Sequence, residues 1–236
     1  MLFFSNRCMH CGLCRSVCPA PGSDRGSIEC QACGQCALAC PHDAKKLCGY
    51  EADTNTVSEK LLRDKEYYTA TGGGVTFTGG ECLLQADALY DMLAKLGREG
   101  VHRAVDTAGA IPWGVFERIL PETDLFLYDL KAFDSSLHLT LTGQGNERVL
   151  DNYRRLAEIA PGKIHVRIPV IPSANDVGDE MACLAGFLHA FPPAKIELLP
   201  YHAMGVGKEK ALGRQENVFA VPSQERMKQL RNLFEI

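Results

Sequence analysis

Beyond residue 50 the chain alternates between short apolar runs and stretches with helical periodicity. The apolar runs predict five strands, at residues 75–78, 102–107, 125–128, 164–171 and 195–199. Helices are predicted around them, at residues 57–69, 84–96, 112–120, 147–159, 179–190 and 223–233. Strands that alternate with helices form right-handed crossovers and a parallel sheet, so the predicted fold class is α/β. The sheet is either an open doubly wound one or part of a (β/α) barrel.

One predicted strand carries a further expectation about burial. Residues 125–128 form a continuous apolar run, which is typical of a parallel strand covered on both faces.

Residues 1–48 show neither pattern. They contain few aliphatic residues and many cysteines, glycines and prolines, so they bury too little apolar surface to fold unaided. Eight of the 11 cysteines of the chain lie between Cys8 and Cys40. The sequence therefore predicts two domains, a small metal-binding domain at residues 1–50 and the α/β domain at residues 51–236. Metal binding supplies the folding free energy of the first.

The clustered cysteines form a repeated motif. C-x2-C-x2-C-x3-C-P begins at Cys8 and recurs 22 residues later at Cys30. This is the run of bacterial two-cluster ferredoxins, in which the fourth cysteine binds the other cluster. The predicted ligands of one 4Fe–4S cluster are Cys8, Cys11, Cys14 and Cys40, and those of the second are Cys30, Cys33, Cys36 and Cys18. The alternative is a zinc ribbon, but zinc takes four ligands per ion and has no use for the third cysteine of each triplet.

The composition of the chain limits which binding partners and which cellular compartment are expected. The net charge of −4 offers no basic field for nucleic acid or for membrane phosphates, so neither is expected as a partner. No apolar run is long enough to span a bilayer, and the first residues lack a signal-peptide pattern. Clustered C-x2-C pairs then predict metal in the cytoplasm instead of disulfides. Cys48 is expected to be a bystander and Cys183 to lie in the core, while Cys82 has no assigned role.

Polar residues or glycines stand at the end of every predicted strand. In chain order they are Gly79, Gly80 and Glu81, then Asp106 and Thr107, then Asp129, Leu130 and Lys131, then Arg167, and last His202. The carboxyl ends of parallel strands converge on one crevice. Carboxylates suit an ammonium group or ribose hydroxyls, Lys131 suits a carboxylate, and paired glycines let a ligand approach the backbone. These residues predict a site for an amino acid joined to a nucleoside.

The same stretches resemble the activating enzymes of glycyl radical enzymes, in the radical S-adenosylmethionine superfamily. The resemblance is to the pyruvate formate-lyase activating enzyme type with a two-cluster ferredoxin insert. It rests on residues 72–81, 106–109, 128–131, 141–143, 167–169 and 199–202. It implies that Gly79-Gly80-Glu81 meets the methionyl ammonium of S-adenosylmethionine, that Asp106, Thr107, Asp129 and Lys131 bind its amino-acid end, and that Arg167 and His202 bind its ribose and adenine side. Leu130, between Asp129 and Lys131, belongs to the same candidate site.

The resemblance also implies a reaction and partners. The family cleaves S-adenosylmethionine reductively to a 5′-deoxyadenosyl radical, which takes hydrogen from a backbone glycine of a partner enzyme. The implied partners are a glycyl radical enzyme as protein substrate and a flavodoxin or ferredoxin-type reductant, and the chain is expected to be a monomer. The sequence does not say which glycyl radical enzyme is activated.

Two departures from the family pattern shape the prediction. Cys82 stands where the family usually has proline, and the 236 residues contain no C-x3-C-x2-C triplet, which holds the catalytic cluster in the family. We therefore expect a truncated, inactive form of a partial (β/α) barrel that lacks its first strand, with no catalytic residue in this chain. A third cluster is expected only in a full-length form. The alternative is a two-cluster electron-transfer protein with an S-adenosylmethionine-binding body and no radical chemistry.

Overall fold

The computed structural model describes residues 1–20, 30–213 and 218–235, which group into two compact units. One unit combines Met1–Glu51 with His202–Phe219, and the other combines Ala52–Tyr201 with Ala220–Ile236. The sequence analysis assigned everything after residue 50 to one body, whereas the structure groups His202–Phe219 with the cysteine-rich segment. Nothing in the local pattern of residues 202–219 signals this grouping, because it depends on contacts with distant parts of the chain.

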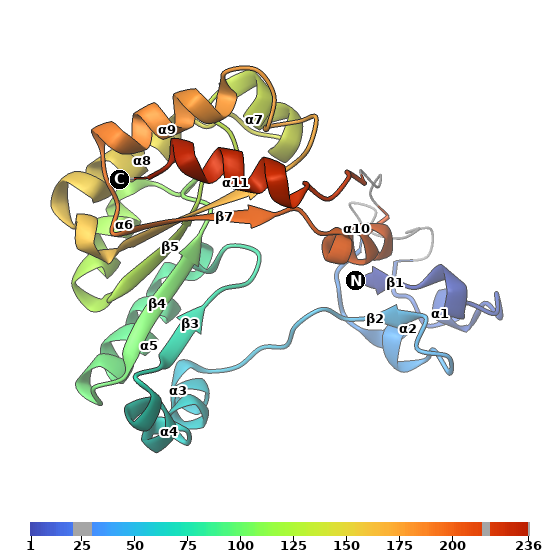
Figure 1. The fold of residues 1–236 in the computed structure, drawn as a ribbon. Helices are drawn as coiled ribbons and strands as arrows, with labels where there is room; N and C mark the ends of the chain where they lie inside the picture. The colour runs from blue at the N-terminus through green and yellow to red at the C-terminus, as the bar shows by residue number, and fades with distance from the viewer. Residues whose placement is uncertain (21–29, 214–217, 236) are drawn as a thin grey trace. The chain divides into compact units, whose positions relative to one another are not determined.

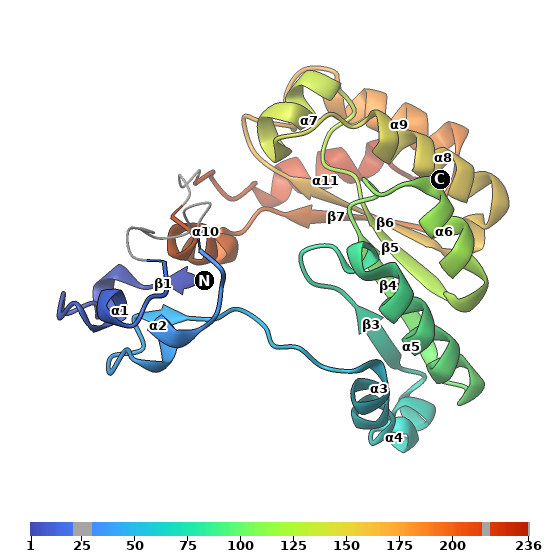
Figure 2. The ribbon, with the colours of Figure 1, turned by 180° about the vertical axis from the view of Figure 1, so that it is seen from behind.

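The larger unit is built on five parallel strands, which Figures 1 and 2 show from opposite sides. They are β3 (Gly74–Phe77), β4 (His102–Thr107), β5 (Leu125–Asp129), β6 (Ile164–Val170) and β7 (Lys195–Pro200). Their order in the sheet follows their order in the chain. Every crossover therefore moves one place in the same direction, as in a (β/α) barrel, whereas a doubly wound sheet reverses at a switch point. The larger unit is a partial barrel.

Helices precede, connect and follow these strands. Their bounds are α3 Thr54–Leu62, α4 Lys65–Thr71, α5 Ala86–Arg98, α6 Trp113–Ile119, α7 Ser135–Thr142, α8 Glu147–Ile159, α9 Glu180–Ala190 and α11 Gln224–Leu233. The helix predicted at residues 57–69 is two helices, α3 and α4. The sequence analysis missed α7, whose apolar residues Leu137, Leu139 and Leu141 stand at every second position and not at helical spacing. That helix is fixed at its start by the Asp134 carboxylate, which accepts a hydrogen bond from the Leu137 N–H, and it ends at Gly143 with φ 83°.

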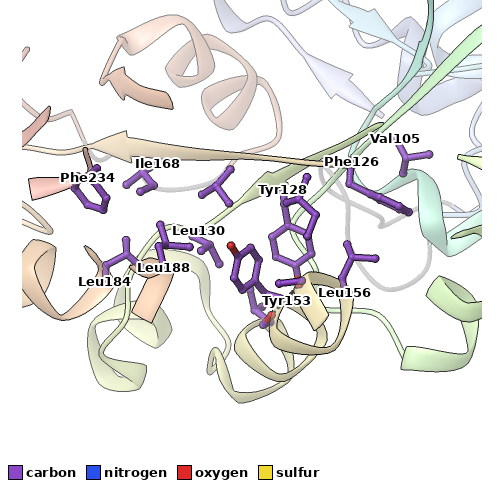
Figure 3. Packing of buried hydrophobic residues seen from close by; sticks show 14 of the residues in the cluster. Val105, Phe126, Tyr128, Leu130, Tyr153, Leu156, Ile168, Leu184, Leu188 and Phe234 are labelled. Atoms are coloured by element: carbon purple, nitrogen blue, oxygen red, sulfur yellow. Dashed lines mark hydrogen bonds between the residues drawn. The ribbon is translucent and has the colours of Figure 1, made fainter. Parts of the chain in front are cut away.

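Only one face of the sheet is fully covered. Along β6 the buried residues alternate with half-buried ones, and the same alternation runs along β5. The buried side chains of β5, Phe126 and Tyr128, pack with residues of α5, α6, α8 and α9 in one core cluster (Figure 3). The expectation that residues 125–128 are covered on both faces is wrong, because Leu125 and Leu127 remain half-buried on the other face. Polar residues are tolerated on that second face.

The smaller unit has short elements and little buried apolar surface. β1 (Leu2–Phe3) pairs antiparallel with β2 (Lys45–Lys46). The described residues of this unit also form the α-helices α1 (Leu13–Ser16), α2 (Gln35–Leu38) and α10 (Val206–Ala211). The sequence repeat is also a backbone repeat. Gly12 and Gly34 share φ 80° and ψ −11°, immediately before α1 and α2. Among the residues that the structure describes, no helix is long and apolar enough to cross a membrane.

Candidate functional site

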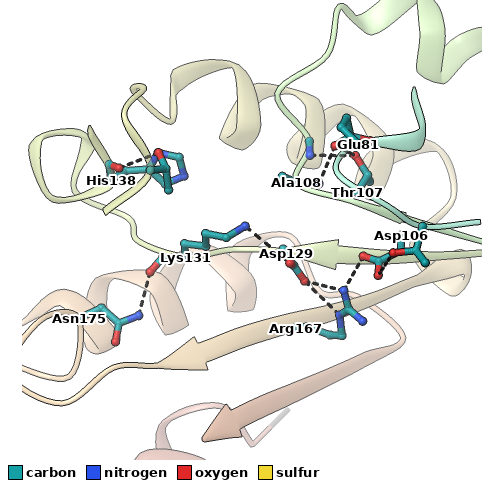
Figure 4. Close-up of polar contacts among 12 residues, drawn as sticks. Glu81, Asp106, Thr107, Ala108, Asp129, Lys131, His138, Arg167 and Asn175 are labelled. Carbon is teal, nitrogen blue, oxygen red and sulfur yellow. Dashed lines mark hydrogen bonds and ion pairs between the residues drawn. The ribbon is translucent and has the colours of Figure 1, made fainter. Parts of the chain in front are cut away.

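A guanidinium group joins two carboxylates at the carboxyl edge of the sheet (Figure 4). Arg167 on β6 is the register partner of Asp129 on β5. Its Nε and Nη2 donate to Asp129 Oδ1 at 3.0 and 2.9 Å, and Nη2 also donates to Asp106 Oδ1 at 2.5 Å. Asp106 Oδ2 accepts a further hydrogen bond, at 3.0 Å, from the hydroxyl of Thr78. Three neighbouring strands thus contribute to one polar cluster on the partly open face.

Lys131 extends this cluster beyond the end of β5. Its Nζ lies 3.6 Å from Asp129 Oδ2, and its side chain is 32% exposed. Between them, the side chain of Leu130 is buried in the core, and its N–H donates to the Arg167 carbonyl at 3.0 Å. Leu130 therefore continues the backbone pairing of β5 with β6, and its buried side chain is not available to a ligand. Lys131 keeps a partly exposed ammonium beside the Asp129 carboxylate.

Glu81 ties the loops after β3 and β4 together. Its Oε1 accepts from the Leu83 N–H at 3.2 Å, and its Oε2 accepts from the Thr107 hydroxyl at 2.9 Å and the Ala108 N–H at 3.0 Å. The Thr107 side chain is buried, and its oxygen also accepts from the Gly109 N–H at 3.0 Å. The side chains of Glu81 and Thr107 thus form hydrogen bonds to other groups of the protein. Glu81 thereby fixes the loop after β3, which a ligand would meet.

The two glycines before Glu81 leave the backbone open. Gly79 has φ +146°, a conformation that residues with a side chain rarely adopt. A Cβ atom added at Gly79 or Gly80 would meet nothing within 4 Å. The backbone N–H and C=O groups of this loop are therefore approachable by a ligand atom.

Cys82 packs beneath this loop as a protonated thiol. Its single S–H lies within hydrogen-bond distance of two acceptors, the Phe77 carbonyl at 3.5 Å and the Asp106 carbonyl at 3.4 Å. Burial, together with the nearby carboxylates of Glu81 and Asp106, raises the pKa of Cys82 to about 12. The residue is structural. By contrast, the expectation that Cys183 lies in the core is wrong, because it is exposed on α9 and the buried face of that helix is made by other residues.

In the smaller unit, seven of the eight cysteines of the repeat line one cavity of about 870 Å³. They are Cys8, Cys11, Cys14, Cys18, Cys30, Cys36 and Cys40. Cys33 is exposed and is not among the lining residues. Within residues 1–20, 30–213 and 218–235, no three Cys, His, Asp or Glu side chains converge closely enough to hold a single metal ion. The cysteines that line this cavity surround one shared volume.

The two cysteine runs approach each other within this unit. Burial raises the pKa of Cys36, Lys45 partly offsets this, and the nearby Cys30 and Cys18 thiols raise the pKa further. Cys18, which ends the first run, therefore lies near Cys36 of the second run. Cys40, which ends the second run, has a lowered pKa because the His42 N–H, and then those of Ala44 and Lys45, donate hydrogen bonds to its sulfur. The last cysteines of the two runs thus differ in their surroundings: Cys18 lies near another thiol, whereas the sulfur of Cys40 accepts backbone hydrogen bonds.

The structure brings most of the predicted strand-end residues together. Asp106, Asp129, Lys131 and Arg167 form one cluster, and Glu81 joins Thr107 beside it. His202 follows β7 but groups with the smaller unit, so its place at the site stays a prediction. Sequence reasoning missed the buried Asn175, which bonds to the backbone at the ends of β5 and β6. No sequence pattern distinguishes it from an ordinary loop asparagine.

Comparisons with known proteins identify relatives that share both sequence and fold. No family model matches the chain. It is 38% identical over 228 residues to the choline trimethylamine-lyase activating enzyme of Oleidesulfovibrio alaskensis, across 90% of this chain and 73% of that protein. It is 32% identical over 247 residues to the trans-4-hydroxy-L-proline dehydratase activating enzyme of Clostridioides difficile, across 100% of this chain and 82% of that protein.

Solved structures agree with these relatives. A domain of the pyruvate-formate lyase-activating enzyme from Bacteroides vulgatus is 35% identical, with a TM-score of 0.58, across 69% of this chain and 92% of that one. A radical SAM methyltransferase from Sphaerobacter thermophilus is 16% identical with a TM-score of 0.58, across 87% of this chain and 59% of that one, and it shares the fold alone. The chain therefore belongs to the glycyl radical enzyme activating enzymes, a family of radical S-adenosylmethionine enzymes.

Proposed function

We propose that the protein binds S-adenosylmethionine at the carboxyl edge of its partial barrel and serves the activation of a glycyl radical enzyme. In that reaction the ligand is cleaved reductively, and the resulting 5′-deoxyadenosyl radical takes hydrogen from a backbone glycine of the partner. The observation that carries the proposal is the cluster of Asp106, Asp129, Lys131 and Arg167 on the partly open face, in a chain of this family.

The charges of this cluster suit the amino-acid end of the ligand. Lys131 offers a partly exposed ammonium for the carboxylate of the ligand, in a charge-assisted hydrogen bond. Asp106 and Asp129 accept hydrogen bonds from an ammonium or from hydroxyls, and Arg167 holds both carboxylates in place. The open backbone of Gly79 and Gly80 adds uncharged donors and acceptors. A zwitterion thus meets groups of both signs.

We propose two 4Fe–4S clusters in the smaller unit. Cys8, Cys11, Cys14 and Cys40 would hold one, and Cys30, Cys33, Cys36 and Cys18 would hold the other. The cavity lined by seven of these cysteines, the closeness of Cys18 to the second run and the repeated backbone support this assignment. When bound, such clusters carry electrons, with the reductant entering as a flavodoxin or ferredoxin-type protein.

The absence of a C-x3-C-x2-C triplet among the 236 residues bears on catalysis. The eight cysteines of the repeat are all assigned to clusters whose irons are capped by cysteine, so no iron is left open for a ligand. We therefore expect these 236 residues alone to yield no 5′-deoxyadenosine. The cysteine repeat also favours a second candidate function, a two-cluster electron-transfer protein with an S-adenosylmethionine-binding body.

Replacing Lys131 tests the proposed site. Lys131→Ala is expected to weaken S-adenosylmethionine binding by about 1.5–3 kcal/mol, which is typical of a hydrogen bond to a charged group. Anaerobic titration calorimetry on the reconstituted protein measures this difference. The matched control is Lys195→Ala, which removes the same side chain at the first residue of β7, at the opposite edge of the sheet. Equal affinity in wild type and Lys131→Ala would remove Lys131 from the site.

A further inference from the structure

Asn175 is a buried side chain that bridges the ends of two strands. Only 1% of it is exposed. Its Nδ2 donates to the Lys131 carbonyl at 2.8 Å and to the Pro169 carbonyl at 2.7 Å, and its Oδ1 accepts from the Ile171 N–H at 2.8 Å. Lys131 lies just beyond β5, whereas Pro169 and Ile171 lie in and just beyond β6. The side chain therefore joins the backbones that carry the two cationic residues of the candidate site.

The bonding of Asn175 fixes which way its amide points. An asparagine side chain has two N–H donors, and both are used by carbonyl groups here, while its oxygen accepts from an N–H. Turning the amide over would place its oxygen against two carbonyl oxygens. Because the site is buried, water does not replace these bonds, and an unmade bond keeps its full cost. The arrangement holds the Lys131 backbone in one position.

Other side chains hold the rest of the loop after Lys131. The buried Asn146 donates to the Ala132 carbonyl at 3.0 Å and to the Phe133 carbonyl at 2.6 Å. Glu180, at the start of α9, accepts from the Phe133 N–H and, at 3.1 Å, from the Asp134 N–H. The loop is thus bonded along its backbone, and Asn175 supplies the bond at the residue that carries the ammonium.

The Lys131 side chain itself is held more loosely. It is 32% exposed, and its Nζ is 3.6 Å from Asp129 Oδ2, longer than an ordinary hydrogen bond. A long side chain on a moving backbone would spread its ammonium over many positions, and ordering it would cost free energy on binding. A fixed backbone reduces that spread.

We infer that Asn175 is the positioning residue for Lys131, and that it sets the affinity of the site for the carboxylate of an amino-acid ligand without touching the ligand. This inference rests on the proposed function, because it assumes that Lys131 binds S-adenosylmethionine. Asn175 acts on the ligand indirectly, through its hydrogen bond to the Lys131 carbonyl. Its second hydrogen bond, to the Pro169 carbonyl, ties the end of β5 to the end of β6.

The test is Asn175→Asp, which keeps the shape of the side chain and replaces its two donors with an oxygen. Anaerobic calorimetry with S-adenosylmethionine is expected to show an affinity loss of about 10-fold, the size expected when a supporting residue is displaced. In a Lys131→Ala background the same change is expected to cause no further loss. General damage to the fold would instead weaken binding in both backgrounds.

A matched control lies at the opposite end of β5. The Asp124 carboxylate accepts from the Arg103 N–H at 2.8 Å and from Arg103 Nε at 2.9 Å. Asp124→Asn is the reverse exchange, and it is expected to lower the melting temperature while leaving the affinity for S-adenosylmethionine unchanged. Should Asn175→Asp fail to fold, Asn175→Ser removes one donor with a milder change and is measured in the same way.

The outcomes separate this inference from the proposed function. Weakened binding in Lys131→Ala and in the Asn175 variants, with no additive loss in the double variant, supports both. Wild-type affinity in folded Asn175 variants, with weak binding in Lys131→Ala, overturns the role of Asn175 and leaves the proposed site intact. Wild-type affinity in Lys131→Ala removes Lys131 from the proposed site, and the positioning role of Asn175 falls with it.

Discussion

The two units of the molecule differ in what holds them together. In the larger unit, side chains from the strands and from α5, α6, α8, α9 and α11 form one continuous buried core. In the smaller unit, Ala44 and Ala211 are the buried apolar residues among those that the structure describes. Apolar burial at about 25 cal/mol per Å² therefore stabilises the first kind of unit and contributes little to the second. The smaller unit has a cavity lined by cysteines where the larger one has a core.

This difference shows two ways in which a sequence can specify a fold. In the larger unit, apolar periodicity decides which face of each element is buried. In the smaller unit, the spacing of cysteines and of the left-handed glycines Gly12 and Gly34 decides where the chain turns. We therefore expect the smaller unit, with its proposed clusters, and the larger unit, with its apolar core, to respond to different perturbations.

Removing the proposed clusters is expected to have the largest effect. Because the proposed clusters are expected to supply the folding free energy of the smaller unit, chelation after oxidation should abolish amide protection in residues 30–51. The core of the larger unit should keep its protection in α5 and α8. Hydrogen exchange read by mass spectrometry compares the two regions in one sample. Loss of amide protection in both units together would contradict the expectation that the two units are stabilised separately.

Removing a buried side chain from the core should destabilise the larger unit and leave the smaller unit unchanged. Leu93 is fully buried in α5, so Leu93→Ala is expected to destabilise the larger unit by about 2–5 kcal/mol, from lost burial and the cavity left behind. The iron content should not change. Leu84→Ala is the matched control, because Leu84 is 75% exposed and the same deletion should cost less than about 0.5 kcal/mol. Denaturant unfolding followed by circular dichroism measures both.

The reactivity of single cysteines toward an alkylating reagent should also differ between buried and exposed positions. The raised pKa of Cys82, about 12, leaves about a thousandfold less thiolate near pH 8 than an ordinary cysteine has. Iodoacetamide at pH 8 should therefore modify the exposed Cys183 and spare Cys82 in the folded protein, and should modify both after unfolding. Peptide mapping identifies the sites. Rapid modification of Cys82 in the folded state would show that it is not a buried thiol.

The same pKa predicts a dependence of stability on pH. Cys82 keeps its proton in the folded state at pH values where the unfolded chain has lost it, because its pKa is raised above the ordinary value of 9.0. Its contribution to stability is therefore complete below about pH 9 and is lost as the pH rises toward about 12. Unfolding curves of wild type and Cys82→Ala at pH 8 and pH 10 should converge at the higher pH.

Sequence reasoning predicted the larger unit well where periodicity is strong. The predicted β4 and α8 have the bounds that the structure gives. In α8 the apolar residues recur at helical spacing along the whole element. It missed α7, and it missed that residues 57–69 form two helices, since neither depends on a strong apolar pattern. It also overstated the burial of β5, because four adjacent apolar residues do not say how many layers cover them.

Some residues of the candidate site could likewise be predicted from the sequence, and others could not. Asp106, Asp129, Lys131 and Arg167 are predictable because topology places strand ends together. The role of Glu81 as a tie between loops and the bonds of Asn175 are not predictable, because they depend on hydrogen bonds across 26 and 44 residues of chain. The grouping of residues 202–219 with the cysteine-rich segment is long-range too.

The central claim is that the smaller unit is organised by two iron–sulfur clusters whose ligands cross between the cysteine runs. The most direct test is the iron and acid-labile sulfide content after anaerobic reconstitution, in wild type, Cys18→Ala and Cys48→Ala. We predict about eight irons and eight sulfides per wild-type chain, from two four-iron clusters, and the same in Cys48→Ala, whose cysteine is exposed and outside the repeat. Cys18→Ala should lose about half and keep one intact cluster. Stoichiometric zinc without sulfide, or full iron content in Cys18→Ala, would contradict the account.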